Sequence, residues 1–73
     1  MPHVIVKLRA GRSDEQKRTL AQAVTDAVMS ALGSAEDSVS VAIEDVQPSE
    51  WRSQVYEPDI LGKPGTIFKK PGY

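Results

Sequence analysis

The first part of the chain alternates apolar and polar positions in the manner of a β-strand. Over residues 2–8, Val4, Val6 and Leu8 fall on one face, and Ile5 falls on the other face between polar neighbours. The alternation stops at a glycine shortly afterwards. The pattern therefore predicts a strand over residues 2–8.

A helix is predicted beyond Gly11 by its start signal and by its apolar periodicity. Ser13, followed three residues later by Gln16, forms a capping box. Apolar side chains then recur at helical spacing and form one stripe, made of Leu20, Ala23, Val24, Ala27, Val28, Ala31 and Leu32. Gly33 is placed to end the helix, so we expect the helix to cover residues 14–32.

A second alternation follows the helix. Its positions divide into an inward face with Val39, Val41 and Ile43 and an opposite face with Ser40, Ala42 and Glu44. A strand, a long helix and a second strand form a right-handed crossover, in which the two strands are parallel neighbours. The chain is therefore expected to be a β-α-β unit of the α/β (α+β) class, a single domain over residues 1–73.

The last part of the chain carries different signals. Pro48 suits the first turn of a short helix that contains Trp51 and Val55. Prolines and glycines then predict an irregular stretch, at Pro58, Gly62, Pro64 and Gly65. Residues 66–69 are expected to form a short edge strand or the arm of a hairpin, followed by a tail.

A two-stranded sheet with one helix leaves one of its faces uncovered. In this chain the uncovered face carries Ile5 and Ala42. Because these apolar side chains need a partner, we expect a homo-oligomer in which a second copy covers this face.

Composition excludes several classes of protein. Lys plus Arg number 9 and Asp plus Glu number 10, which gives a net charge of −1 and argues against a nucleic-acid-binding surface or a basic membrane patch. No apolar run reaches the length of about 20 residues that a membrane span needs, and no signal peptide is apparent. We expect a cytoplasmic protein. The absence of cysteine and the single histidine predict no disulfide and no metal site.

Pro2 is the strongest candidate for a catalytic group. Once Met1 is removed, the proline nitrogen is a free secondary amine and no longer part of an amide. An α-amino group titrates near pH 7.7–8.0 in reference peptides, and burial beside a cation lowers this pKa. Such an amine suits proton transfer near neutral pH. The alternative is that Pro2 merely begins an edge strand.

Three further residues are candidates for the same site. Arg12 directly precedes the predicted helix, so its guanidinium and the free N–H groups of the first turn could bind one carboxylate. Trp51 could line the site and exclude water, although packing is the commoner role of a large aromatic side chain. Arg9 is an additional cation. His3 is interpreted as a surface or interface residue.

Taken together, the Met-Pro start, the strand, the run Gly11–Lys17 and the long helix resemble the tautomerase superfamily, and within it the 4-oxalocrotonate tautomerase group. This resemblance covers residues 2–51. The Gly-Lys-Pro sequence at 62–64 and the final segment 69–73 look like the bacterial PptA-like tautomerases. Those relatives are dimers, whereas the classical enzymes are hexamers. The resemblance therefore implies a dimer, with a hexamer as the alternative.

The resemblance also implies an activity and roles for residues. The family interconverts the enol and keto forms of a small 2-oxo (2-hydroxy-dienoic) carboxylic acid, without a cofactor or metal. Pro2 matches the amino-terminal proline that acts as general acid and base, and Arg12 matches the arginine that binds the substrate carboxylate. Trp51 falls where the family has an aromatic residue lining the pocket. The implied partner is a small enol that bears a carboxylate.

Ser40 departs from the family pattern. The classical enzymes have at this position a second arginine, which polarises the substrate carbonyl across a subunit interface. Loss of one such donor costs about 10²–10³ in rate. We therefore expect a preference for a monocarboxylic enol such as phenylenolpyruvate, with Ser40 contributing a neutral hydroxyl. Arg9 or Arg52 could replace the missing arginine.

Two other functions fit parts of the pattern. The pair Arg9 and Arg12 resembles the 3-chloroacrylic acid dehalogenases of the same superfamily, but these enzymes need a glutamate where this chain has Ser53. Glu50 and Glu57 are close in sequence and out of register. A non-catalytic oligomeric β-α-β binding module is the alternative from a different class, in which Pro2 has no chemical role.

Overall fold

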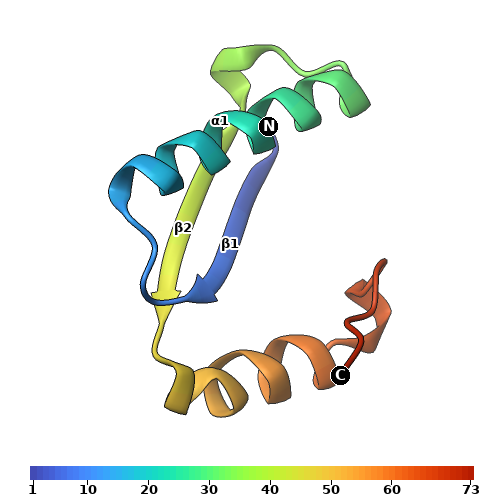
Figure 1. Ribbon diagram of the computed structural model, residues 1–73. Helices are drawn as coiled ribbons and strands as arrows, with labels where there is room; N and C mark the ends of the chain where they lie inside the picture. Colours follow the sequence, from blue (N-terminus) through green and yellow to red (C-terminus); the bar gives the residue numbers. More distant parts are fainter.

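The computed structural model describes residues 1–73 and contains a β-α-β unit followed by a helical C-terminal part (Figure 1). The strands β1 (His3–Arg9) and β2 (Ser40–Val46) are parallel neighbours, and the helix α1 (Asp14–Leu32) connects them. The predicted parallel crossover and the predicted bounds of the helix are confirmed. Each strand begins one residue later, and ends one or two residues later, than the alternation indicated.

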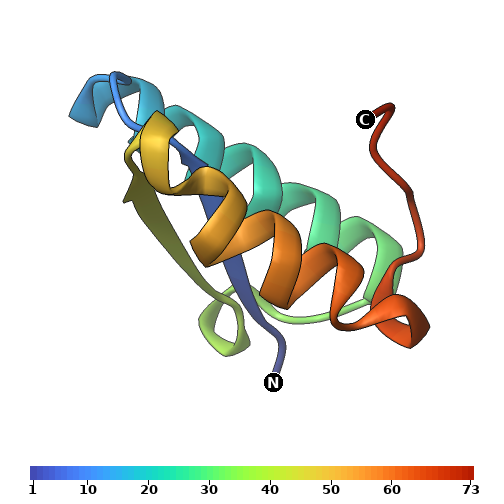
Figure 2. The same cartoon turned by 90° about the horizontal axis from the view of Figure 1, so that it is seen from below.

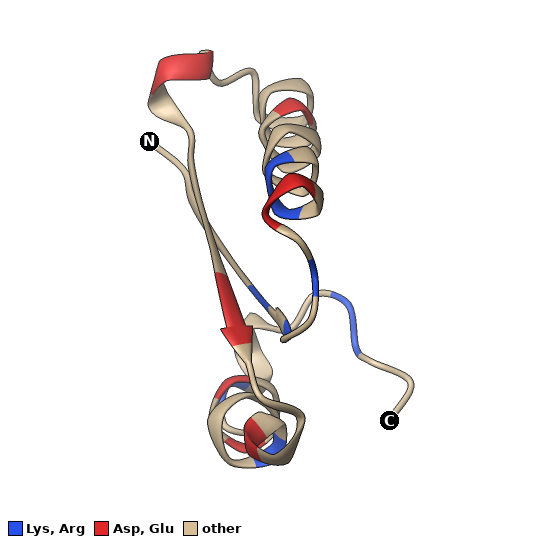
Figure 3. Ribbon diagram, turned by 60° about the vertical axis from the view of Figure 1, so that its left-hand side comes forward, with Lys and Arg blue, Asp and Glu red and all other residues tan.

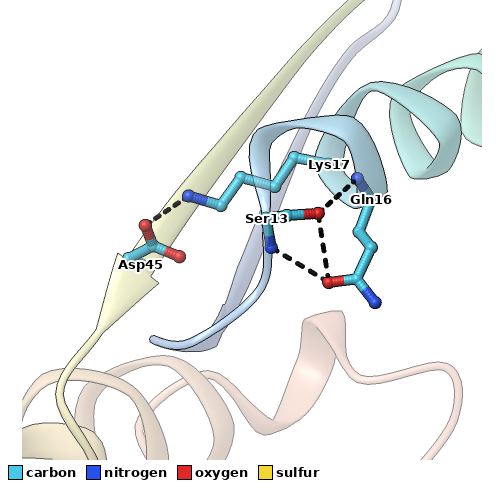
Figure 4. Close-up of polar contacts among 4 residues, drawn as sticks. All are labelled: Ser13, Gln16, Lys17 and Asp45. Atoms are coloured by element: carbon cyan, nitrogen blue, oxygen red, sulfur yellow. Dashed lines mark hydrogen bonds and ion pairs between the residues drawn. The ribbon is translucent and has the colours of Figure 1, made fainter.

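The ends of α1 follow from the local sequence. The Ser13 Oγ accepts the backbone N–H of Gln16 at 3.1 Å, and the Gln16 Oε1 accepts the backbone N–H of Ser13 at 2.9 Å (Figure 4). At the other end, Gly33 adopts φ 68°, a left-handed conformation that favours glycine, and its N–H donates to the Met29 carbonyl at 2.9 Å. Both predicted caps are therefore formed.

The register of the strands sorts their side chains into two faces. Val4 pairs with Val41 and Val6 pairs with Ile43, so the apolar positions of both strands lie on the same face. This face is covered by α1, which lies on only one side of the sheet (Figure 3). The opposite face includes the partner residues Ile5 and Ala42, as expected.

The C-terminal part contains the 3₁₀ turns η2 (Pro48–Glu50) and η4 (Pro64–Thr66), with the wide π-helix η3 (Arg52–Leu61) between them. Pro48 stands in the first turn of η2, as predicted. The expected irregular stretch is wrong for its first residues, because η3 continues through Pro58 to Leu61, and the irregular part begins only at Gly62. Proline removes only one N–H donor from the helix, and the remaining i→i+5 bonds persist.

The end of η3 requires glycine at position 62. The Gly62 N–H donates to the Glu57 carbonyl at 2.8 Å, and a Cβ at Gly62 would lie 2.6 Å from the Pro58 carbonyl oxygen. The expected strand or hairpin arm over residues 66–69 does not form. The N–H of Thr66 instead closes η4 by donating to the Lys63 carbonyl at 3.0 Å. The chain then turns back and ends beside η3 (Figure 1).

The helix η3 lies below the carboxyl ends of the strands (Figures 1 and 2). Its side chains line a hollow together with Ile5 and Lys7 of the second face of the sheet. The only two buried residues, Val46 at the end of β2 and Val55 in η3, belong to this region. Lys7 on the same face forms an ion pair with Asp59 of η3 at 2.5 Å. Ile5, nearer the amino end, is 52% exposed. Part of the face is therefore still uncovered.

The isolated chain is open for its size. Its accessible surface is 5539 Å², whereas a compact monomer of 8.0 kDa exposes about 4,450 Å². Its radius of gyration is 13.6 Å, compared with about 11 Å for a compact domain of this length.

No helix has the length and apolar character that crossing a membrane would need.

Candidate active site

The candidate residues fall into two groups at opposite ends of the sheet. The amino-end group contains Pro2, His3 and Ser40. Here the Ser40 N–H donates to the Pro2 carbonyl at 3.2 Å, and the Ser40 Oγ lies 2.6 Å from the His3 Nδ1. Met1 precedes Pro2 in this structure and is fully exposed. The proline nitrogen is a tertiary amide in this form and becomes basic only when Met1 is removed.

The carboxyl-end group contains Arg9, Arg12, Trp51 and Tyr73. Arg9 is the last residue of β1 and shares one hollow with Pro48, Trp51 and Tyr73. The structure thus brings together Arg9 and Trp51, two of the predicted residues, although they are far apart in sequence. Trp51 is half-buried, between η2 and η3.

Arg12 lines a separate hollow at the same end of the sheet, between β1 and α1. The residue directly precedes the Ser13 cap, and the hollow also contains Leu8 and Leu20. The Arg12 guanidinium is exposed and makes no ion pair. By contrast, Lys17 in the first turns of α1 is paired with Asp45 of β2 (Figure 4). Arg12 is therefore an unpaired cation directly before the start of α1, where an anion is favoured.

The two groups do not meet within one chain. The strand β1 has seven residues, and its ends are about 20 Å apart at the rise of a β-strand. Pro2 lies before the first of these residues, and Arg12 lies beyond the last. A site that used both residues would therefore have to combine the Pro2 of one copy with the Arg12 of another.

An ion pair fixes η3 beside the carboxyl-end group. Lys7 donates to Asp59, and the Lys63 Nζ lies 3.6 Å from the same carboxylate. The hydrogen bond from Lys7 holds the pKa of Asp59 below its ordinary value of 3.8. The hydrogen bond to Asp59 likewise raises the pKa of Lys7 above its ordinary value of 10.5. This pair orients the helix that carries Trp51 at its start.

Sequence reasoning missed two members of these groups. Tyr73 packs against Tyr56 with ring centroids 5.5 Å apart, which holds the end of the chain over Trp51. No local pattern predicts that contact. The His3–Ser40 contact depends on the register of the two strands, although both residues stand at the start of the predicted alternations.

The residues weighed for a dehalogenase make local contacts within the C-terminal part. Ser53 donates its hydroxyl to the Glu50 carbonyl at 3.2 Å, and the Glu50 carboxylate accepts a hydrogen bond from Gln54. Glu57 pairs with Arg52 at 3.0 Å on an exposed surface. No three side chains among His, Asp and Glu gather as a metal site would require.

The fold agrees with the comparison to known proteins. Residues 2–55 match the family described as "Tautomerase enzyme". The chain belongs to this family, and the expected keto-enol tautomerase is confirmed at the level of the enzyme family.

Individual relatives match over the whole chain. A probable tautomerase of Xylella fastidiosa is 45% identical, over 100% of this chain and 89% of that protein. Tautomerase PptA of Cronobacter sakazakii is 42% identical, over 100% of this chain and 97% of that protein. The predicted resemblance to the PptA-like tautomerases is confirmed.

Solved structures confirm the β-α-β fold. One of the 4-oxalocrotonate tautomerase isozymes from Methylibium petroleiphilum has a TM-score of 0.67 at 40% identity, over 68% of this chain and 81% of that one. TomN, a 4-oxalocrotonate tautomerase homologue of the tomaymycin biosynthetic pathway, also has a TM-score of 0.67, at 28% identity. That match covers 89% of this chain and 97% of TomN, so it includes most of the C-terminal part.

Proposed function

We propose that this protein interconverts the enol and keto forms of a small 2-oxo carboxylic acid, with the amine of Pro2 as general base and then general acid. In ketonisation, the amine accepts the proton of the enol O–H while the carbonyl forms, and the resulting ammonium delivers a proton to carbon. The reaction moves one proton and needs no other reactant. Removal of Met1 is the condition for this chemistry.

The single observation that carries the proposal is the unpaired Arg12 at the positive end of α1. A guanidinium next to free backbone N–H groups binds a carboxylate through charge-assisted hydrogen bonds. Trp51 and Arg9 share a hollow at the same end of the sheet, and these side chains are proposed to line the substrate site. When Arg12 of one copy binds the carboxylate of the substrate, the enol group of the same molecule is held beside Pro2 of another copy.

The proposed enzyme is a homo-oligomer, and the dimer is favoured. The chain exposes about 1,100 Å² more surface than a compact monomer of its mass. A second copy placed over the uncovered part of the sheet would bury Ile5 and would bring its Arg12 to the first copy's Pro2. The helix η3 already occupies part of the face, which favours the smaller assembly.

Ser40 favours a substrate with one carboxylate. The position holds a neutral hydroxyl, and residues 1–6 and 38–43 contain no Lys or Arg. A second carboxylate near this end of the sheet would therefore have no cationic partner in the same chain. We expect phenylenolpyruvate to be a better substrate than a dicarboxylic enol.

The test is the ketonisation of phenylenolpyruvate by protein from which Met1 has been removed, with intact mass as proof of processing. Pro2→Ala and Arg12→Ala are compared with Lys70→Ala, a control that changes one exposed cation in the tail. We expect both site variants to lose at least 100-fold in kcat/KM and the control to keep wild-type activity. Circular dichroism and light scattering verify fold and assembly.

Three results would contradict the proposal. Activity that survives Pro2→Ala would exclude the proline as the proton carrier. Activity absent from the processed wild type, on both monocarboxylic and dicarboxylic enols, would favour the non-catalytic β-α-β binding module. A stable monomer in light scattering would remove the shared site on which the mechanism depends.

A further inference from the structure

His3 and Ser40 form a side-chain pair directly beside Pro2. The two residues are register partners at the start of β1 and β2, on the face of the sheet that α1 leaves uncovered. The Ser40 Oγ and the His3 Nδ1 lie 2.6 Å apart, and the Ser40 N–H donates to the Pro2 carbonyl. One serine thus contacts both the backbone of the candidate base and the histidine ring.

The polarity of this contact decides what the hydroxyl can do. When the His3 Nδ1 accepts the hydrogen bond, the Ser40 hydroxyl donates its proton to the ring and has none left to donate elsewhere. When the Nδ1–H donates, the Ser40 Oγ accepts and its own proton is free for another acceptor. Only the second arrangement provides a hydrogen-bond donor to a molecule bound next to Pro2.

The surroundings make His3 the group that controls this hydroxyl. No Asp, Glu, Lys or Arg occurs in residues 1–6 or 38–43, so His3 is the only ionisable side chain on the amino halves of both strands. The charged residues that flank these two segments are Asp37, Lys7 and Glu44, with Glu36 beside Asp37 in the exposed turn that precedes β2. Lys7 and Glu44 are register partners further along the same face, and Lys7 donates to Asp59. None of these charged side chains is hydrogen-bonded to Ser40 or His3.

We propose that His3 is a positioning residue of the tautomerase site, in which its Nδ1–H holds the Ser40 hydroxyl so that the hydroxyl donates to the enol or keto oxygen of the substrate. This inference rests on the proposed function. The oxygen gains negative charge when Pro2 removes its proton, and a donor aimed at it stabilises that charge. Ser40 keeps its proton throughout, so the proton balance of the reaction is unchanged.

The experiment compares His3→Leu, Ser40→Ala and the double variant in phenylenolpyruvate ketonisation by processed protein. Each single variant is expected to lower kcat about tenfold and to leave KM within about twofold, as loss of one neutral hydrogen bond would. The double variant is expected to lose no more than either single variant, because both remove the same donor. His3→Asn, whose amide N–H can occupy the place of Nδ1–H, is expected to restore most of kcat.

Ser38→Ala is the matched control. Ser38 stands two residues before Ser40 and outside the amino-end group, and its hydroxyl donates to the Ala35 carbonyl at 2.8 Å. We therefore expect this variant to keep wild-type activity. Losses that add in the double variant, or that appear in KM alone, would overturn the inference. Activity that needs Pro2 but is indifferent to both single variants would overturn only the inference. Activity that survives Pro2→Ala would overturn the proposed function together with it.

Discussion

Pro2 and Arg12 lie at opposite ends of β1, separated by a strand of seven residues. Pro2 is tied to the start of β2 by the hydrogen bond from the Ser40 N–H, and Arg12 is placed by the capped start of α1. Both positions are set by regular secondary structure, so flexibility within one chain does not bring them together. A shared site is therefore the direct consequence of the fold for any chemistry that uses both residues.

This separation predicts that two inactive variants complement each other. We expect Pro2→Ala and Arg12→Ala to be inactive separately and to regain about a quarter of wild-type activity after they are unfolded together and refolded at equal amounts. Random mixing gives an intact pair at about one site in four when the two residues come from different copies. The double variant Pro2→Ala/Arg12→Ala, mixed with Pro2→Ala, is the control. Absence of recovery in a mixed oligomer would contradict a shared site.

The Lys7–Asp59 pair predicts how stability depends on pH. The pKa of Asp59 is lowered from 3.8, so its contribution is present above that pH and is lost as the pH falls through the folded value. The pKa of Lys7 is raised from 10.5, so its contribution is lost as the pH rises through the folded value. We expect the Tm difference between wild type and Asp59→Asn to be largest between about pH 5 and pH 10 and to narrow on both sides.

The control for this measurement is Glu57→Gln, which breaks an exposed ion pair of the same helix. Its partner Arg52 is 73% exposed, so we expect a small and nearly constant change in Tm over the same range. A difference for Asp59→Asn that persists unchanged at pH 2 would show that the carboxylate charge contributes nothing to the stability of η3.

The capping box predicts a measurable loss of stability. Ser13→Ala removes the acceptor for the Gln16 N–H, and we expect the free energy of unfolding to fall by about 1 kcal/mol. Urea denaturation at fixed protein concentration measures this change. Ser30→Ala, near the other end of α1 and exposed, should have a much smaller effect. Equal losses in the two variants would contradict the role of the cap.

The contact of the chain end with the Trp51 hollow predicts a fluorescence change. Trp51 is the only tryptophan, and Tyr73 lines the hollow beside it. We expect Tyr73→Ala to shift the emission to longer wavelength and to raise quenching by acrylamide, because water reaches the indole. Phe68→Ala is the control, since Phe68 is 99% exposed and lines none of these hollows. Identical quenching of wild type and Tyr73→Ala would place the tail away from Trp51.

The β-α-β unit could be predicted because its signals are local. The alternation around Val4 and Val41, the Ser13 cap and the Gly33 stop each act within a few residues, and a parallel crossover follows from their order. Pro58 misled the prediction of the C-terminal part. A proline usually ends an α-helix, whereas the wide turns of η3 accommodate it.

The sequence by itself determined the elements of the β-α-β unit, the division of each strand into two faces and the identity of the candidate groups Pro2 and Arg12. Only the tertiary structure decided that Ser40 meets His3, that Asp59 meets Lys7 and that Tyr73 reaches Trp51. The reason is physical. Caps and alternation depend on neighbours along the chain, whereas these contacts depend on strand register and on the path of η3, which are set by packing between residues distant in sequence.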